Sequence, residues 1–337
     1  MGLEKRERGE AFHEVGDGLL LDWEREELLS ALCPTGSVDD FERQCLNYLQ
    51  RRGALTDWEL QRRRMGDRHF TLQRHRIIAP IQTGDTYHVF EAQHLFTGRI
   101  DVVKVLRRDK VTSALVASHL RRARIQSSVE SAHLVRLYDA RYARATHYIV
   151  NERVSGTDLL RSVMARGPLS VTRAAACGIA TALALDAIHA RGLIHGALRP
   201  TKVLVGDTGS FKLADVGTAE PPGVFDFSRN SHLVRADYLP PEAIRCERVT
   251  AVSDIYLLGC VLYLAVTGVA PFPGGTGEQK AHAHCTSEPV DPREICEGID
   301  GEFIEALREM MTKDPSARMH SMRDVAARLE QWALISK

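Results

Sequence analysis

The strands and helices that the sequence predicts are segregated along the chain, and this order constrains the fold most. Short β-rich runs fill residues 76–153 and are interrupted by one helical stretch at 111–128. Residues 154–333 are mostly helical, and the run Ile255–Thr267 is apolar on all sides, which is typical of a helix buried in a core. Strands followed by helices predict an α+β protein with a small β-rich lobe and a larger helical lobe.

Residues 1–75 are charged and favour helix, so we expect a short helical leader rather than a separate enzyme. One helix is expected at 41–49, where apolar residues recur at helical spacing. A second is expected after Thr56, which can cap its first turn. Two interpretations of this leader remain open: it binds a partner protein, or it packs against the small lobe.

Composition excludes several classes of function. The 337 residues include 44 basic and 44 acidic side chains, so zero net charge gives no reason to expect a nucleic-acid partner. The seven cysteines form no C-x-x-C pair, and neither a metal site nor a disulfide framework is expected. The N-terminus has no apolar signal-peptide core, and the longest apolar run, Ile255–Ala270, is too short to span a bilayer. We therefore expect a cytoplasmic protein without a membrane span.

Five segments carry residues suited to chemistry or to holding a fold together. In chain order they are Val102-Val103-Lys104, His195-Gly196-Ala197-Leu198 before the strand Val203-Leu204-Val205, Lys212-Leu213-Ala214-Asp215-Val216-Gly217, Tyr238-Leu239-Pro240-Pro241-Glu242, and Ser253-Asp254 at the start of the apolar helix.

In this order and spacing, the five segments resemble the bacterial serine/threonine protein kinases over residues 76–333. The resemblance implies a two-lobed kinase-like fold, with lobes at about 76–153 and 154–333. It implies that Lys104 reaches nucleotide phosphates and that Asp215 holds magnesium. It also implies structural roles for His195, Asp254, Glu242 and Arg318. Among these four residues, Glu242 and Arg318 are expected to form a pair.

The resemblance places a degraded nucleotide pocket in this chain. Of the family's glycine-rich loop, aligned with residues 82–89, only the middle glycine remains, and glycines there let backbone amides approach phosphate. We expect no firmly held cofactor, and only weak binding of ATP with or without magnesium. The pocket residues implied are Gly84, Val89, Val102, Lys104, Leu204 and Asp215.

The catalytic positions depart most from the family. Ala197 stands where the family has the aspartate that acts as the base, so no catalytic residue is assigned. General-base catalysis contributes about a hundred- to ten-thousand-fold, or about 3–5 kcal/mol of barrier. Gly196 replaces an arginine, and Lys202 replaces the asparagine that binds the second magnesium. Two interpretations of Lys202 stay open: its charge replaces that of the ion, or it is a drifted surface lysine.

The helix of the small lobe shows a further departure. The family's glutamate, which pairs with the strand lysine, falls near Arg122, and its neighbourhood contains no acid. Lys104 is therefore expected to form a salt bridge with Asp215.

Together these losses predict a pseudokinase, a regulatory or scaffold module that binds a protein partner. The alternative is a kinase with residual or atypical ATP-dependent phosphoryl transfer, which is suggested by the survival of Lys104 and Asp215. A misalignment cannot restore the base, because His195 and Leu198 fix the register around Ala197.

Overall fold

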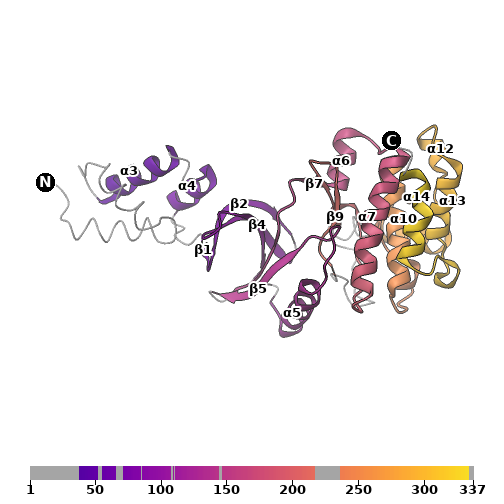
Figure 1. The fold of residues 1–337 in the computed structure, drawn as a ribbon, viewed down its shortest axis with the longest axis horizontal. Coiled ribbons are helices and arrows are strands. Elements are labelled where there is room, and N and C mark those ends of the chain that lie inside the picture. Colours follow the sequence, from indigo (N-terminus) through magenta and orange to yellow (C-terminus); the bar gives the residue numbers. More distant parts are fainter. Residues whose placement is uncertain are drawn as a thin grey trace. The chain divides into compact units, whose positions relative to one another are not determined.

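The computed structural model describes residues 38–51, 55–65, 71–84, 86–107, 109, 111–143, 146–216 and 236–333 (Figure 1). The expectations for residues 1–37 and for Gly217 lie outside these ranges. The chain divides into two compact units, residues 1–116 with 138–153 and residues 117–137 with 154–337. Each unit is described by itself.

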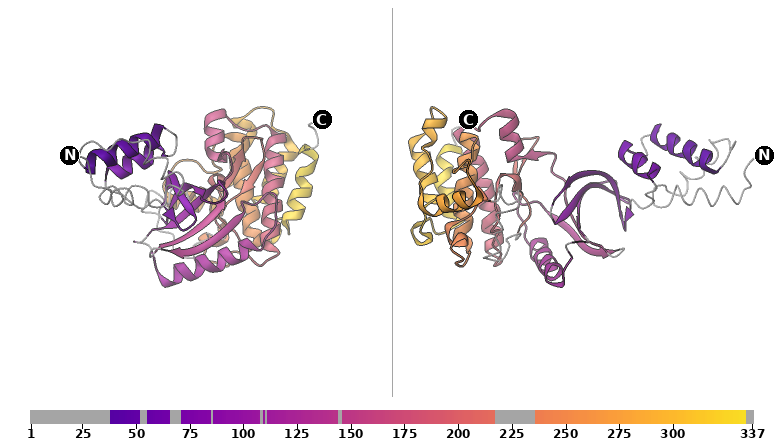
Figure 2. Two further views of the ribbon diagram at one scale, coloured as in Figure 1. Left: turned by 60° about the vertical axis from the view of Figure 1, so that its left-hand side comes forward. Right: turned by 180° about the vertical axis from the view of Figure 1, so that it is seen from behind.

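The first unit is built on a six-stranded sheet with the order β1-β2-β3-β4-β6-β5. The sheet is strongly curled, as Figure 2 shows. Its core contains Ile77, Val103 and Val150, which come from three different strands. The strands are β1 Thr71–Leu72, β2 His75–Thr83, β3 Tyr87–His94, β4 Ile100–Leu106, β5 Leu137–Ala143 and β6 Thr146–Glu152.

The leader contains two described helices, α3 Val38–Arg51 and α4 Asp57–Arg64, close to the predicted positions. Thr56 and Glu59 form a capping box at α4, in which each side chain accepts a hydrogen bond from the other residue's amide, at 3.2 and 2.8 Å. Glu59 is fully buried and binds Arg76 of β2 through two hydrogen bonds of 2.7 and 2.8 Å. Helix α4 is therefore fastened to the sheet.

Two predicted boundaries were wrong. The leader does not stay helical to residue 75, because β1 pairs with β2. A strand was also expected at 134–138, but β5 begins only at Leu137. The reason is tertiary: the chain around Leu134 pairs instead with Leu213, whose amide and carbonyl bond His133 O at 2.7 Å and Val135 N at 2.8 Å.

The second unit is mainly helical, with a three-stranded sheet of order β7-β8-β9. Almost all of α10 is buried, and α7 packs against both α10 and α14. Its elements are the C-terminal part of α5 Ser113–Ser127, β7 Gly156–Asp158, α6 Leu159–Arg166, α7 Val171–His189, the 3-10 turn η2 Pro200–Lys202, β8 Val203–Gly206, β9 Phe211–Leu213, α9 Pro241–Ile244, α10 Ala251–Thr267, α11 Gly277–Thr286, α12 Pro292–Ile295, α13 Gly301–Met310, the 3-10 turn η3 Pro315–Ala317 and α14 Met322–Ala333.

Helix α7 explains an apparent membrane signal. It is the one helix in the described ranges that is long and apolar enough to cross a bilayer. More than half of it is buried, however, and a core helix of a globular domain passes the same test. Gly178 lets it approach α14 closely, because a Cβ there would lie 2.5 Å from Leu329 Cδ1. Helix α7 is thus packed as a core helix.

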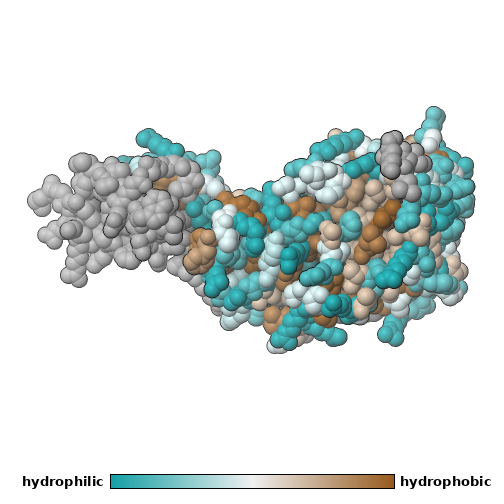
Figure 3. All heavy atoms as spheres, viewed as in Figure 1, coloured by the Kyte–Doolittle hydropathy of each residue, from teal (hydrophilic) through white to brown (hydrophobic). Residues whose placement is uncertain are grey.

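Figure 3 shows apolar residues interspersed with hydrophilic ones on the face in view. The large apolar side chains that the structure exposes, such as Phe96 in the first unit and Met164 in the second, come from separate elements. Scattered exposed apolar residues are ordinary for a protein surface. They single out no docking surface.

Candidate functional site

The loop between α7 and β8 is organised by His195, whose side chain is completely buried. Its Nδ1 accepts the Ala197 amide at 3.3 Å, so Nε2 carries the ring proton and donates it to Ala214 O at 3.1 Å. Burial lowers the pKa of His195, which keeps the ring neutral. The ring therefore joins this loop to the segment that leads to Asp215.

Asp254, fully buried on α10, anchors the same loop. Its Oδ2 accepts the His195 amide at 2.9 Å and the Nε2 proton of His189 at 2.8 Å, and its Oδ1 accepts the Gly196 amide at 2.7 Å. Hydrogen bonds to a carboxylate are stronger than those between neutral groups. The contact of His189 was missed in the sequence, where nothing links this helical residue to Asp254.

The backbone conformation of Gly196 explains why a glycine suits the position where the family has an arginine. Its backbone is left-handed, with φ of 64°, a region that glycine enters without steric cost. A side chain at this position would be disfavoured, so the glycine relieves strain while it removes the family's arginine.

Ala197 lies within this rigid loop. Its amide is held by His195, and the next residue, Leu198, is completely buried in the core of the second unit. The register of the loop is therefore fixed at the base position. A methyl side chain there can neither accept a proton nor orient a hydroxyl group.

Asp215 is paired with Lys202, which was not foreseen in the sequence. The Lys202 ammonium donates a hydrogen bond to Asp215 Oδ2. The two side chains are 17% and 22% exposed. The ammonium of Lys202 therefore has a carboxylate partner, and the two interpretations of its role stay predictions.

A second cation in the same loop, Arg199, was also missed. Arg199 donates a hydrogen bond from Nε to the Thr201 hydroxyl at 3.0 Å. Desolvation is the main cause that lowers the pKa of His195; the charge of Asp254 and the hydrogen bond to Ala214 O act to raise it, and the charges of Lys202 and Arg199 make smaller contributions that lower it. The sequence shows both cations, but it does not show that both charges act on His195.

In the first unit, the sheet brings some of the predicted nucleotide residues together. Lys104 on β4 pairs in register with Val89 on β3 and with Ile149 on β6, and desolvation lowers the pKa of Lys104 to about 8. Val102 lies on the same strand, and the Gly84 amide closes the turn before β3 by donating to Tyr87 O at 2.8 Å.

The remaining pocket residues belong to the second unit. Leu204 lies on β8, opposite Lys212 of β9, and Asp215 follows that hairpin. Because Lys104 and Asp215 lie in different units, a pair between them stays a prediction, as does the nucleotide pocket as a whole.

The helix of the small lobe, α5, lacks the glutamate of the family along its whole length. Helix α5 contains no Asp or Glu anywhere along its 15 residues. No shift of register along α5 can therefore supply the acid that the family pairs with the strand lysine.

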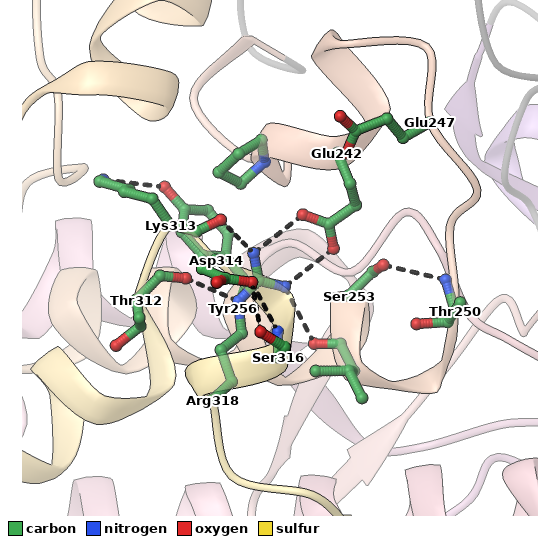
Figure 4. A network of polar contacts seen from close by, with 12 residues as sticks. Glu242, Glu247, Thr250, Ser253, Tyr256, Thr312, Lys313, Asp314, Ser316 and Arg318 are labelled. Atoms are coloured by element: carbon green, nitrogen blue, oxygen red, sulfur yellow. Dashed lines mark hydrogen bonds and ion pairs between the residues drawn. The ribbon is translucent and has the colours of Figure 1, made fainter.

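Glu242 and Arg318 form the expected pair, and Figure 4 shows the network around it. Two parallel hydrogen bonds of 2.8 Å join the guanidinium to the carboxylate, and both residues are 2% exposed. Desolvation acts to raise the pKa of Glu242, but the hydrogen bonds from Arg318 and Ser253 outweigh it and the pKa is lowered. Arg318 also donates to Thr312 O at 2.7 Å, which ties α9 to the loop after α13.

A curled sheet with one helix, a helical unit and this anchored loop are the parts of a protein kinase fold. Residues 76–328 match the protein kinase domain family, so the chain belongs to that family.

Bacterial relatives agree with this assignment. The chain is 32% identical over 273 residues to a probable serine/threonine-protein kinase of Corynebacterium efficiens, covering 76% of this chain and 41% of the relative. It is 30% identical over 256 residues to the serine/threonine-protein kinase PknB of Mycobacterium tuberculosis, covering 73% of this chain and 41% of the relative. The chain thus spans about two fifths of the length of these relatives.

The residues at the metal position do not fit magnesium. Protein kinases hold Mg²⁺ with the aspartate at position 215 and the asparagine at position 202. Here the second residue is a lysine, whose ammonium has donors only and is bonded to the first. Within the described ranges, there is no group of three or more His, Cys, Asp or Glu residues that could hold a metal ion. At an effective dielectric constant of 20, two like unit charges 4 Å apart repel by about 4 kcal/mol, and Mg²⁺ carries two.

Proposed function

We propose that this kinase-family domain does not transfer phosphate and acts as a regulatory or scaffold module that binds a protein partner. One observation carries the proposal: the base position, Ala197, offers a methyl group inside a loop whose backbone is anchored by Asp254 and His195. Phosphoryl transfer requires a residue that orients the acceptor hydroxyl group, and a methyl group cannot do so.

Several losses act in the same direction. The base accounts for about 3–5 kcal/mol of barrier. Helix α5 contains no Asp or Glu, so it cannot supply the glutamate that kinases place on this helix. Meanwhile the contacts that hold the fold together, the Glu242–Arg318 pair and the Asp254 anchor, are all present. A chain that keeps its shape and lacks its chemistry favours a binding role.

The proposal is tested by following phosphate transfer from ATP to a generic protein substrate and to the chain itself. The Asp215→Ala variant gives the background rate of phosphate transfer, because it lacks the one acidic metal ligand that the family pattern retains. We expect the wild type to remain at this background with either Mg²⁺ or Mn²⁺. Transfer at the 1–100 per second typical of kinases, abolished by Asp215→Ala, would refute the proposal and favour the alternative of a functioning kinase.

The binding role has its own test. The wild type and Ala197→Asp should recover the same cross-linked protein partners from the native cell, because the partner would recognise the folded surface. Loss of those partners from Arg318→Ala, together with a loss of folding, would support recognition of the folded shape. Partners that bind only when the base is restored would contradict it.

A further inference from the structure

The contact between Lys202 and Asp215 is determined by a β-hairpin. The register of β8 and β9 pairs Val203 with Leu213. One step beyond that pair, the Ala214 amide donates to Lys202 O at 2.8 Å. Lys202 therefore ends the 3-10 turn η2 directly opposite the residue before Asp215, and the two side chains start from neighbouring backbone positions. The backbone of Asp215 is left-handed, with φ of 60°, a conformation that aspartate adopts more readily than most residues.

The Lys202–Asp215 pair is partly buried, so water and salt screen the attraction between its charges less than at an exposed site. Both side chains are less than a quarter exposed. Exposed ion pairs are weak because water and salt screen them, whereas screening decreases with burial. An ammonium ion in this place supplies a positive charge at the carboxylate that the family uses to hold metal. It does so permanently, because the lysine is part of the chain.

We propose that Lys202 is a built-in cation that replaces the divalent metal of the kinase fold at Asp215. The second unit then excludes Mg²⁺ and Mn²⁺ from this position, and a phosphate-bearing nucleotide bound by the protein is held without a divalent ion. This inference rests on the proposed function, since a domain that transfers no phosphate does not need the catalytic metal. It is nevertheless tested by metal binding, which can be measured whether or not transfer occurs.

The direct test measures Mn²⁺ alone binding to the full chain, by electron paramagnetic resonance of the free ion. The variants are Lys202→Asn, which restores the family's ligand, and the matched control Lys212→Asn, the same change on the facing strand. We expect the wild type and Lys212→Asn to bind no Mn²⁺ at this site at millimolar concentration. Lys202→Asn should bind it at least tenfold more tightly, and adding Asp215→Asn should abolish that gain.

A second arm uses nucleotide. Thermal denaturation of the wild type with ADP should shift equally with Mg²⁺ and with EDTA, whereas that of Lys202→Asn should depend on Mg²⁺. Far-UV circular dichroism and the Lys202→Met variant, which removes the charge without adding a ligand, show whether the change disturbs folding.

Three results would overturn the inference: wild-type Mn²⁺ binding that Asp215→Asn removes, a failure of folded Lys202→Asn to gain Mn²⁺ binding, or a wild-type nucleotide shift that requires Mg²⁺. Phosphate transfer by the wild type without Mn²⁺ binding at Asp215 would instead refute the proposed function alone.

Discussion

Replacing Arg318 with alanine should destabilise the second unit severely. Arg318 is 2% exposed and makes two hydrogen bonds to Glu242 and a third to Thr312 O. The substitution leaves a carboxylate that is itself 2% exposed without its cation. Removing one partner of a buried ion pair costs about 3–5 kcal/mol, because the remaining charge keeps its desolvation penalty.

The pH dependence of this contribution follows from the lowered pKa of Glu242. A depressed carboxyl pKa stabilises the folded state above the unfolded value of 4.5, and the stabilisation is lost as the pH falls through the lowered pKa. In Arg318→Ala the hydrogen bonds and the positive charge of the guanidinium are gone and only the contribution of Ser253 among the side chains is left, so the pKa of Glu242 should rise. The variant should therefore lose little further stability between neutral pH and the acid range where the wild type loses this contribution.

Urea denaturation at pH 7, followed by far-UV circular dichroism, measures the effect. The matched control is Arg245→Ala, which removes an ion pair to Glu247 at 2.9 Å whose side chains are 39% and 52% exposed. The control should cost no more than about 1 kcal/mol. A second variant, Glu242→Gln with Arg318→Met, removes both charges and should recover part of the loss. If Arg318→Ala costs no more than the control, the energetic account of this pair is incorrect.

Three further predictions concern other elements. Burial lowers the pKa of His284 to about 3, so this residue should not reduce the free energy of unfolding above pH 6.5. Between pH 6.5 and pH 3 the free energy of unfolding should fall by on the order of 4 kcal/mol, because the unfolded state takes up the proton first. His284→Gln should make the acid-denaturation curve flatter over this pH range. Gly196→Ala should cost about 1 kcal/mol in thermal denaturation because of its positive φ, and an unchanged midpoint would contradict the strain argument. Arg76→Ala should leave Glu59 buried without its guanidinium, and faster hydrogen exchange in α4, with unchanged exchange in α7, would be the expected result.

The elements and the motif register could be predicted from the sequence, because both depend on local patterns. Strand β4 has the predicted bounds, Ile100–Leu106, since a Val-rich run between polar residues needs no distant information. The register of the loop around Ala197 could be predicted for a similar reason, because it depends on two flanking residues, His195 and Leu198.

Only the tertiary structure decided which charges meet. Lys202 and Asp215 are 13 residues apart, and it is the β8–β9 hairpin that brings them together. Likewise, no pattern in the sequence indicates that Arg76 binds Glu59, which lies 17 residues before it. The late start of β5 has the same origin, because Leu134 pairs with a distant strand. Residue type is a local property, whereas the energy of a charge or a backbone amide depends on the segment that the fold places beside it.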